Sequence, residues 1–181
     1  STEGKKSRKV VEYGIEALKA VWHRGAVDAD GKTGDGAGIH VEIPKDFFIE
    51  KIEVTGHNHD NSEICVGMIF LPRNDYAAQE NCKTIVESEL TKNDFSIYGW
   101  RQVPVNPKVL GEKAFQTMPE IIQVLFKSNN PDLLNKDLER KIYETRRIIE
   151  NKAFQISLNN FYICSYIYLK TPNGERIVAE S

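Results

Sequence analysis

The residues with the clearest capacity for chemistry lie in one glycine-rich stretch near the N-terminus. Five of the twelve glycines fall between positions 25 and 38, in a stretch that follows Arg24 and contains the carboxylates of Asp28, Asp30 and Asp35. Glycine at this density is typical of a backbone with unusual dihedrals or a close approach to another group. Two interpretations are open: a loop in which the planar fork of Arg24 binds a carboxylate ligand, and a structural turn that Arg24 closes by pairing with Asp28 or Asp30. His23 either tunes such a site by titrating near neutrality or packs at a helix end.

The same stretch contains a pattern that imitates a phosphate-binding loop. The relaxed form of the phosphate-binding pattern is matched by Ala26, followed by four residues and then Gly31-Lys32-Thr33. A phosphate-binding loop needs a buried strand before it and a helix after it, so that the amides at the helix start face the phosphate. Here a helical pattern precedes the loop, a strand pattern follows it, and two aspartates inside it would repel phosphate. We therefore expect no nucleotide to bind.

Two other groups of residues suggest metal or thiol chemistry. His57-Asn58-His59-Asp60 could form a metal clip, but no other histidine or cysteine is near in sequence, so we expect a solvated loop. The three cysteines, Cys65, Cys82 and Cys164, are widely spaced and lie in apolar contexts. Such residues are typical of buried, reduced thiols in the cytoplasm. No metal site is expected.

The elements that must position these residues follow from apolar spacing. Residues three and four apart predict a helix from about Ser7 to Trp22, with Ser7 as its N-cap and Gly25 beyond its end. Alternating or continuous apolar runs predict the strands, and the run at 64–71 is expected to be buried on both faces. The turn at Asn173-Gly174 is expected to join the last two strands. The expected helices are 45–52, 75–90 and 137–152, and the expected strands are 39–43, 64–71, 95–103, 120–126, 161–169 and 176–179. This order indicates an α+β fold or a layered α/β sandwich.

Composition limits the class of protein. A chain of 181 residues without repeats or linkers is expected to form a single domain over residues 1–181. A net charge of −2 gives no electrostatic case for nucleic acid. No apolar run is long enough to span a membrane, and no signal peptide is seen. The sequence thus predicts a cytoplasmic protein that binds neither nucleic acid nor membranes.

Four segments, in order, resemble the glutaminase domain of glutamate synthases, a class II, N-terminal-nucleophile amidotransferase. The resemblance runs from the first helix to about Ser165, and four ordered motifs are far more specific than any one of them. The matching segments are His23–Asp30 with Thr33–Ile39, then Val66–Arg73, Tyr98–Val105 and Phe161–Ser165.

The resemblance implies a fold, a reaction and site residues. The fold is the four-layer αββα sandwich of N-terminal-nucleophile hydrolases. The reaction is hydrolysis of L-glutamine to glutamate and ammonia, and the ammonia is passed to 2-oxoglutarate. No cofactor is implied for this domain; FMN and an iron–sulfur cluster belong to other domains of the parent enzyme, which are the implied partners.

The resemblance also assigns residues. Arg24 helps to fix the glutamine pocket, and the Gly25 backbone lets the substrate come close. Trp100 and Arg101 give structural or substrate-side support, and the sequence does not choose between the two. The supporting loop around Arg24 comprises His23, Thr33, Gly34, Asp35 and Gly36.

The chain departs from the family pattern at both ends. Family members begin with a nucleophilic cysteine that leads an apolar strand, whereas this chain begins with Ser1 and a polar, lysine-rich segment. Asn173-Gly174 lies outside the context of the Asn-Gly pair that forms the family's oxyanion hole. We therefore expect a fragment without the nucleophile or the oxyanion donors, inactive by itself. The alternative is a non-catalytic structural or interaction module.

Overall fold

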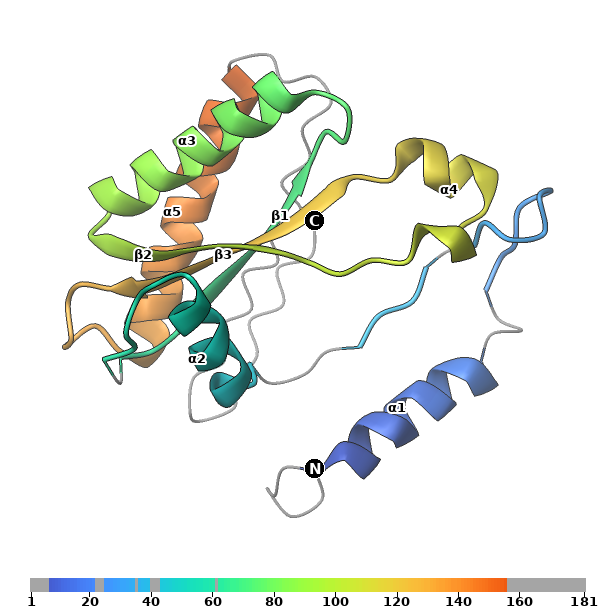
Figure 1. The fold of residues 1–181 in the computed structure, drawn as a ribbon, viewed down its shortest axis with the longest axis horizontal. Coiled ribbons are helices and arrows are strands. Elements are labelled where there is room, and N and C mark those ends of the chain that lie inside the picture. Colours follow the sequence, from blue (N-terminus) through green and yellow to red (C-terminus); the bar gives the residue numbers. More distant parts are fainter. Residues whose placement is uncertain (1–6, 22–24, 35, 40–42, 61, 156–181) are drawn as a thin grey trace. The chain divides into compact units, whose positions relative to one another are not determined.

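The computed structural model describes residues 7–21, 25–34, 36–39, 43–60 and 62–155 (Figure 1). The chain divides into two compact units, Ser1–Val41 with Val105–Met118 and Glu42–Pro104 with Pro119–Ser181. The single domain over residues 1–181 stays a prediction. The expected strands at 161–169 and 176–179, the turn at Asn173-Gly174 and most of the strand at 39–43 lie outside the described residues.

The first unit contains α1 (Arg8–Ala20), the short 3-10 helix η2 (Pro107–Val109) and α4 (Glu112–Thr117). Ser7 is the N-cap of α1, as expected, although its side chain makes no capping hydrogen bond. No residue of α1 is buried, so the apolar stripe of this helix is only half covered or exposed. No helix was predicted from the sequence where η2 and α4 lie, because such short helices carry no clear periodicity.

The second unit is built on a three-stranded antiparallel sheet of β1 (Cys65–Leu71), β2 (Phe95–Gln102) and β3 (Glu120–Ser128). The strand order is β1-β3-β2, so the last of the three described strands lies in the centre. All three expected strands are confirmed to within two residues at each end. Helices together with an antiparallel sheet are compatible with the predicted α+β class.

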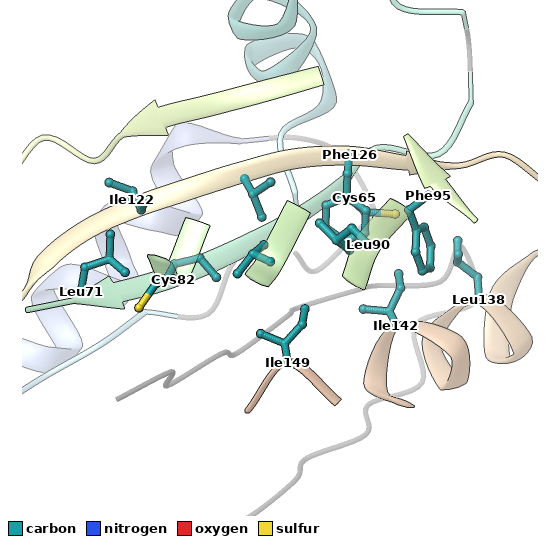
Figure 2. Packing of buried hydrophobic residues seen from close by; sticks show 13 residues of the cluster. Cys65, Leu71, Cys82, Leu90, Phe95, Ile122, Phe126, Leu138, Ile142 and Ile149 are labelled. Carbon is teal, nitrogen blue, oxygen red and sulfur yellow. The ribbon is translucent and has the colours of Figure 1, made fainter. Parts of the chain in front are cut away.

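One face of the sheet is covered by α3 (Tyr76–Lys92) and α5 (Asn135–Gln155) (Figure 1). We call it the helix-pair face. The carboxylate of Asp75 caps α3 by accepting a hydrogen bond from the Ala78 amide at 2.9 Å. Leu138, Ile142, Thr145 and Ile149, which recur at three- and four-residue spacing along α5, are all buried. Figure 2 shows the cluster that fills this layer, which comprises Cys65, Ile69, Leu71, Cys82, Val86, Leu90, Phe95, Ile122, Val124, Phe126, Leu138, Ile142 and Ile149.

The opposite face packs against α2 (Lys45–Val54), and we call it the α2 face. Phe48 and Ile52 of the helix belong to a second buried cluster together with Val66 of β1 and Leu125 of β3. β1 therefore contributes buried side chains to both faces, which confirms the expectation for the run at 64–71.

A β-bulge in β2 decides which face each of its later side chains reaches. Ile97 pairs with Phe126 and Gly99 with Leu125, so Tyr98 is an extra residue in the ladder. Side chains alternate between faces, and one extra residue reverses that alternation from the bulge onward. Tyr98 consequently packs on the α2 face, whereas Trp100, two residues later, packs on the helix-pair face.

The two described cysteines are buried, free thiols, as expected. Burial raises the pKa of Cys65 to about 12, and the charge of Glu63 acts in the same direction. The pKa of Cys82 is also raised to about 12, by burial and by Asp75. Both side chains are packing residues and not nucleophiles, because reactivity requires the thiolate. Cys164 lies outside the described residues.

Candidate functional site

The predicted site residues fall into three groups. His23, Arg24 and Asp35 lie outside the described residues, so their side chains have no assigned positions. Gly25, Thr33, Gly34 and Gly36 belong to the first unit, and Trp100 and Arg101 belong to the second.

Residues 27–34 form a closed loop. Val27 and Gly34 make an antiparallel bridge, and the Asp28 amide donates a hydrogen bond to the Thr33 carbonyl at 2.7 Å. The Gly31 amide donates to the Asp28 carbonyl at 2.9 Å. Gly31 and Gly36 have φ of 69° and 79°, which confirms that the glycines supply unusual dihedrals.

The carboxylate of Asp30 organises the tip of this loop. It accepts hydrogen bonds from the Lys32 amide at 2.9 Å, the Thr33 amide at 2.7 Å and the Thr33 hydroxyl at 2.5 Å. A fourth bond comes from the backbone of Glu112. These donors, the Thr33 hydroxyl first, hold the pKa of Asp30 well below its usual range. Asp30 is therefore a fixed anion inside the loop.

The carboxylate occupies the place that a phosphate would need. In a phosphate-binding loop the amides after the glycines point to the ligand. Here the amides of Lys32 and Thr33 are already bonded to Asp30. The geometry agrees with the expectation that the Gly31-Lys32-Thr33 pattern does not bind nucleotide.

We expect millimolar ATP with magnesium to leave the unfolding temperature of the protein unchanged. A ligand that bound only the folded state would raise it by mass action. Isothermal calorimetry with the wild type and with Lys32→Ala checks this, and the two proteins are expected to give the same null titration. Micromolar ATP binding that Lys32→Ala abolishes would contradict the prediction.

Trp100 and Arg101 both have structural partners. The Trp100 Nε1 donates to the Glu87 carboxylate on α3 at 2.6 Å. The Arg101 guanidinium donates to the Gln123 side chain of β3 at 2.6 Å and lies 5.0 Å from the centre of the Phe47 ring on α2. These contacts support the structural alternative for both residues, and a role toward substrate stays a prediction.

A polar cluster around Tyr98 was not anticipated from the sequence. The loop at 57–60 is exposed at His57, Asn58 and Asp60, as expected. Asp60 also forms an ion pair with Lys127 and accepts hydrogen bonds from the Ser62 hydroxyl at 2.5 Å and the Tyr98 hydroxyl at 3.3 Å. Tyr98 and Lys127 come from β2 and β3, far along the chain from Asp60, so no local motif indicates these two partners. Among the described residues no group of three or more His, Cys, Asp or Glu side chains is placed to hold a metal ion.

We expect Asp60→Asn to lower the unfolding temperature by a few degrees at pH 7, and less as the medium becomes acidic. Lys127 and Ser62 hold the pKa of Asp60 well below its usual range. The ionised carboxylate thus favours the folded state above the unfolded pKa of about 3.9, and this contribution is lost as the pH falls toward the depressed folded-state pKa. The effect is modest because the Asp60 side chain is 51% exposed.

Scanning calorimetry of the wild type and Asp60→Asn between neutral pH and about pH 2.5 checks this linkage. Asp132→Asn, which removes an exposed carboxylate elsewhere in the same unit, is the matched control. A difference between wild type and Asp60→Asn that stayed constant down to the lowest pH would contradict the role of the ionised carboxylate.

None of the helices in the described part of the chain is both long and apolar enough to cross a membrane.

Comparisons with known proteins agree on one family. Residues 1–171 match the family model described as "Glutamine amidotransferases class-II". The chain is 53% identical over 163 residues to the "Glutamate synthase (NADPH) large chain" of Azospirillum brasilense, an alignment that covers 90% of this chain and 11% of that protein.

Two ferredoxin-dependent relatives are more distant. "Ferredoxin-dependent glutamate synthase 1, chloroplastic/mitochondrial" of Arabidopsis thaliana is 38% identical over 161 residues, which is 88% of this chain and 10% of that protein. "Ferredoxin-dependent glutamate synthase 2" of Synechocystis sp. is 34% identical over 164 residues, which is 90% of this chain and 10% of that protein. The chain thus spans about a tenth of the length of these relatives.

Proposed function

This chain belongs to the class II glutamine amidotransferases, and from that premise we propose that it acts as the glutaminase domain of a glutamate synthase. The observation that carries the proposal is the family match over residues 1–171. The similar proteins reported above are all named glutamate synthases, which supports glutamate synthase as the parent enzyme. The order of the four sequence motifs points the same way.

The proposed reaction is hydrolysis of L-glutamine. A cysteine thiolate attacks the side-chain amide carbon, its α-amino group transfers the proton to the leaving nitrogen, and ammonia departs. Water then hydrolyses the thioester, which releases glutamate and restores the thiol. Neither Cys65 nor Cys82 suits this role, because each is buried with a raised pKa. The nucleophile of the proposal is the N-terminal cysteine of the family.

In this reaction Arg24 binds the α-carboxylate of glutamine and Gly25 lets the substrate approach the backbone. A guanidinium makes two parallel hydrogen bonds to a carboxylate, which fixes its position as well as attracting it. The closed loop at 27–34 supports this assignment, because the chain leaving Gly25 enters a segment held by several hydrogen bonds.

We extend the proposal to the fold and the setting of the domain. A three-stranded sheet covered by two helices on one face is compatible with half of the four-layer αββα sandwich of N-terminal-nucleophile hydrolases. FMN and an iron–sulfur cluster would lie in other domains of a cytoplasmic enzyme, where the ammonia reacts with 2-oxoglutarate. The names of the relatives include NADPH in one case and ferredoxin in the other.

Isotope transfer in the intact enzyme tests this function. Glutamine labelled with ¹⁵N in its side-chain amide is supplied with 2-oxoglutarate and a reductant, and the amino group of the newly formed glutamate is analysed by mass spectrometry. We expect label transfer, and ammonia release when 2-oxoglutarate is omitted. An enzyme that makes glutamate from free ammonia but neither hydrolyses nor uses glutamine would overturn the proposal and favour the non-catalytic module.

A further inference from the structure

The closed loop at 27–34 is packed against a segment almost eighty positions later in the chain. Gly111, the N-cap of α4, is buried against the tip of the loop. A Cβ atom on Gly111 would overlap the Thr33 hydroxyl and the Asp30 carboxylate and would lie 2.6 Å from the Thr33 amide nitrogen. All of these atoms belong to the first unit, and only glycine fits this contact.

Two carboxylates of the loop bond to α4 at the same place. Asp30 accepts a hydrogen bond from the Glu112 backbone as well as from its own loop. Asp28 forms an ion pair with Lys113 at 2.6 Å. The Lys113 side chain is 66% exposed, so this pair contributes little by itself. The Asp30 contact is the more directional one, because its donors come from both segments.

We propose that Asp30 and Gly111 are positioning residues for the backbone at Gly25, which the substrate approaches in the proposed glutaminase function on which this inference rests. The loop begins at Val27, two residues after Gly25, and its bridge to Gly34 fixes the direction in which the chain leaves Gly25. A backbone that a substrate approaches must be held to within about 0.5 Å. The Gly111 contact and the Asp30 hydrogen bonds restrain the loop that follows Gly25.

The first test is Gly111→Ala in the intact enzyme, with glutaminase kinetics measured as ammonia release. The added methyl group pushes the loop from α4, so the KM for glutamine is expected to rise about tenfold while kcat changes by less than about threefold, the pattern of lost uniform binding. Gly14→Ala is the matched control, because nothing lies within 4 Å of a Cβ there. It is expected to keep the KM of the wild type.

The second test is the pair Asp30→Ala and Asp30→Asn. Alanine removes every acceptor for the Lys32 and Thr33 amides and is expected to raise the KM about tenfold, as Gly111→Ala does. Asparagine keeps one oxygen acceptor and is expected to recover at least half of that loss on a logarithmic scale. Asp132→Ala, an exposed charge change in the second unit, controls for charge alone. Unfolding temperatures and ammonia-dependent glutamate formation are measured for every variant.

The outcomes separate this inference from the function on which it rests. If the wild type does not hydrolyse glutamine, the proposed function fails. If the wild type does so and both Gly111→Ala and Asp30→Ala keep its KM, only the positioning role is overturned. A lower kcat together with a lower unfolding temperature, without a selective rise in KM and without recovery in Asp30→Asn, would indicate a purely structural role. That result would also overturn the positioning role.

Discussion

Replacing Arg24 by lysine in the intact enzyme is expected to lower kcat/KM for glutamine roughly 100-fold, with most of the change in KM. An ammonium group cannot reproduce the planar fork that binds both oxygens of a carboxylate. A hydrogen bond to a charged group contributes about 1.5–3 kcal/mol, and 2.7 kcal/mol corresponds to about 100-fold. Steady-state ammonia release over a range of glutamine concentrations measures the effect.

Arg8→Lys is the matched control for this substitution. Arg8 lies in α1 of the same unit, where its side chain is 77% exposed and pairs with Glu12 at 3.2 Å. Exchanging one cation for another in such a pair costs little, so wild-type kinetics are expected. Normal glutamine kinetics in Arg24→Lys, with the unfolding temperature unchanged, would assign Arg24 to loop closure instead of substrate binding.

The largest expected effect on stability comes from Phe126→Ala in the central strand. Phe126 is 0% exposed and packs edge-to-face against Phe95, with ring centres 5.3 Å apart (Figure 2). Removing a buried phenyl ring leaves a cavity and typically costs about 3–5 kcal/mol. For a chain of this size we expect the unfolding temperature to fall by roughly 8–16 °C, as measured by scanning calorimetry.

Phe154→Ala supplies the control of the same chemistry at an exposed position. Phe154 lies near the end of α5 and is 86% exposed. Its truncation is expected to change the free energy of unfolding by less than about 0.5 kcal/mol. Equal destabilisation by the two substitutions would contradict the assignment of Phe126 to the core between the sheet and the helix pair.

The elements predicted from the sequence are those whose buried residues recur at the regular spacing of a helix or a strand. The apolar run at 64–71 and the helix predicted at 137–152 depend on neighbours in the chain, and both were found as expected. The helix α4 was missed, since six residues are too few for a period. Its role depends on Gly111 meeting a loop from a distant part of the chain, which no local pattern records.

The candidate site was predictable to a smaller extent. The sequence located the glycine-rich loop but not the use of Asp30 as its internal anion, because the partner amides are defined only once the loop has closed. The Asp60 cluster depends on Tyr98 and Lys127 from two other strands. The sheet faces on which Trp100 and Arg101 lie depend on the bulge at Tyr98. Composition does not reveal an extra residue in a strand.

The central position of β3 has a consequence for the newly made chain on the ribosome. Among the described strands, β1 and β2 do not pair with each other, and both pair with β3, which ends at Ser128. The ribosome adds about 5–20 residues per second. On the order of several seconds therefore pass between synthesis of the apolar segment Cys65–Leu71 and synthesis of its hydrogen-bonding partner. During translation this segment is a nascent-chain surface that chaperones can engage, and completion of β3 is the event that removes it.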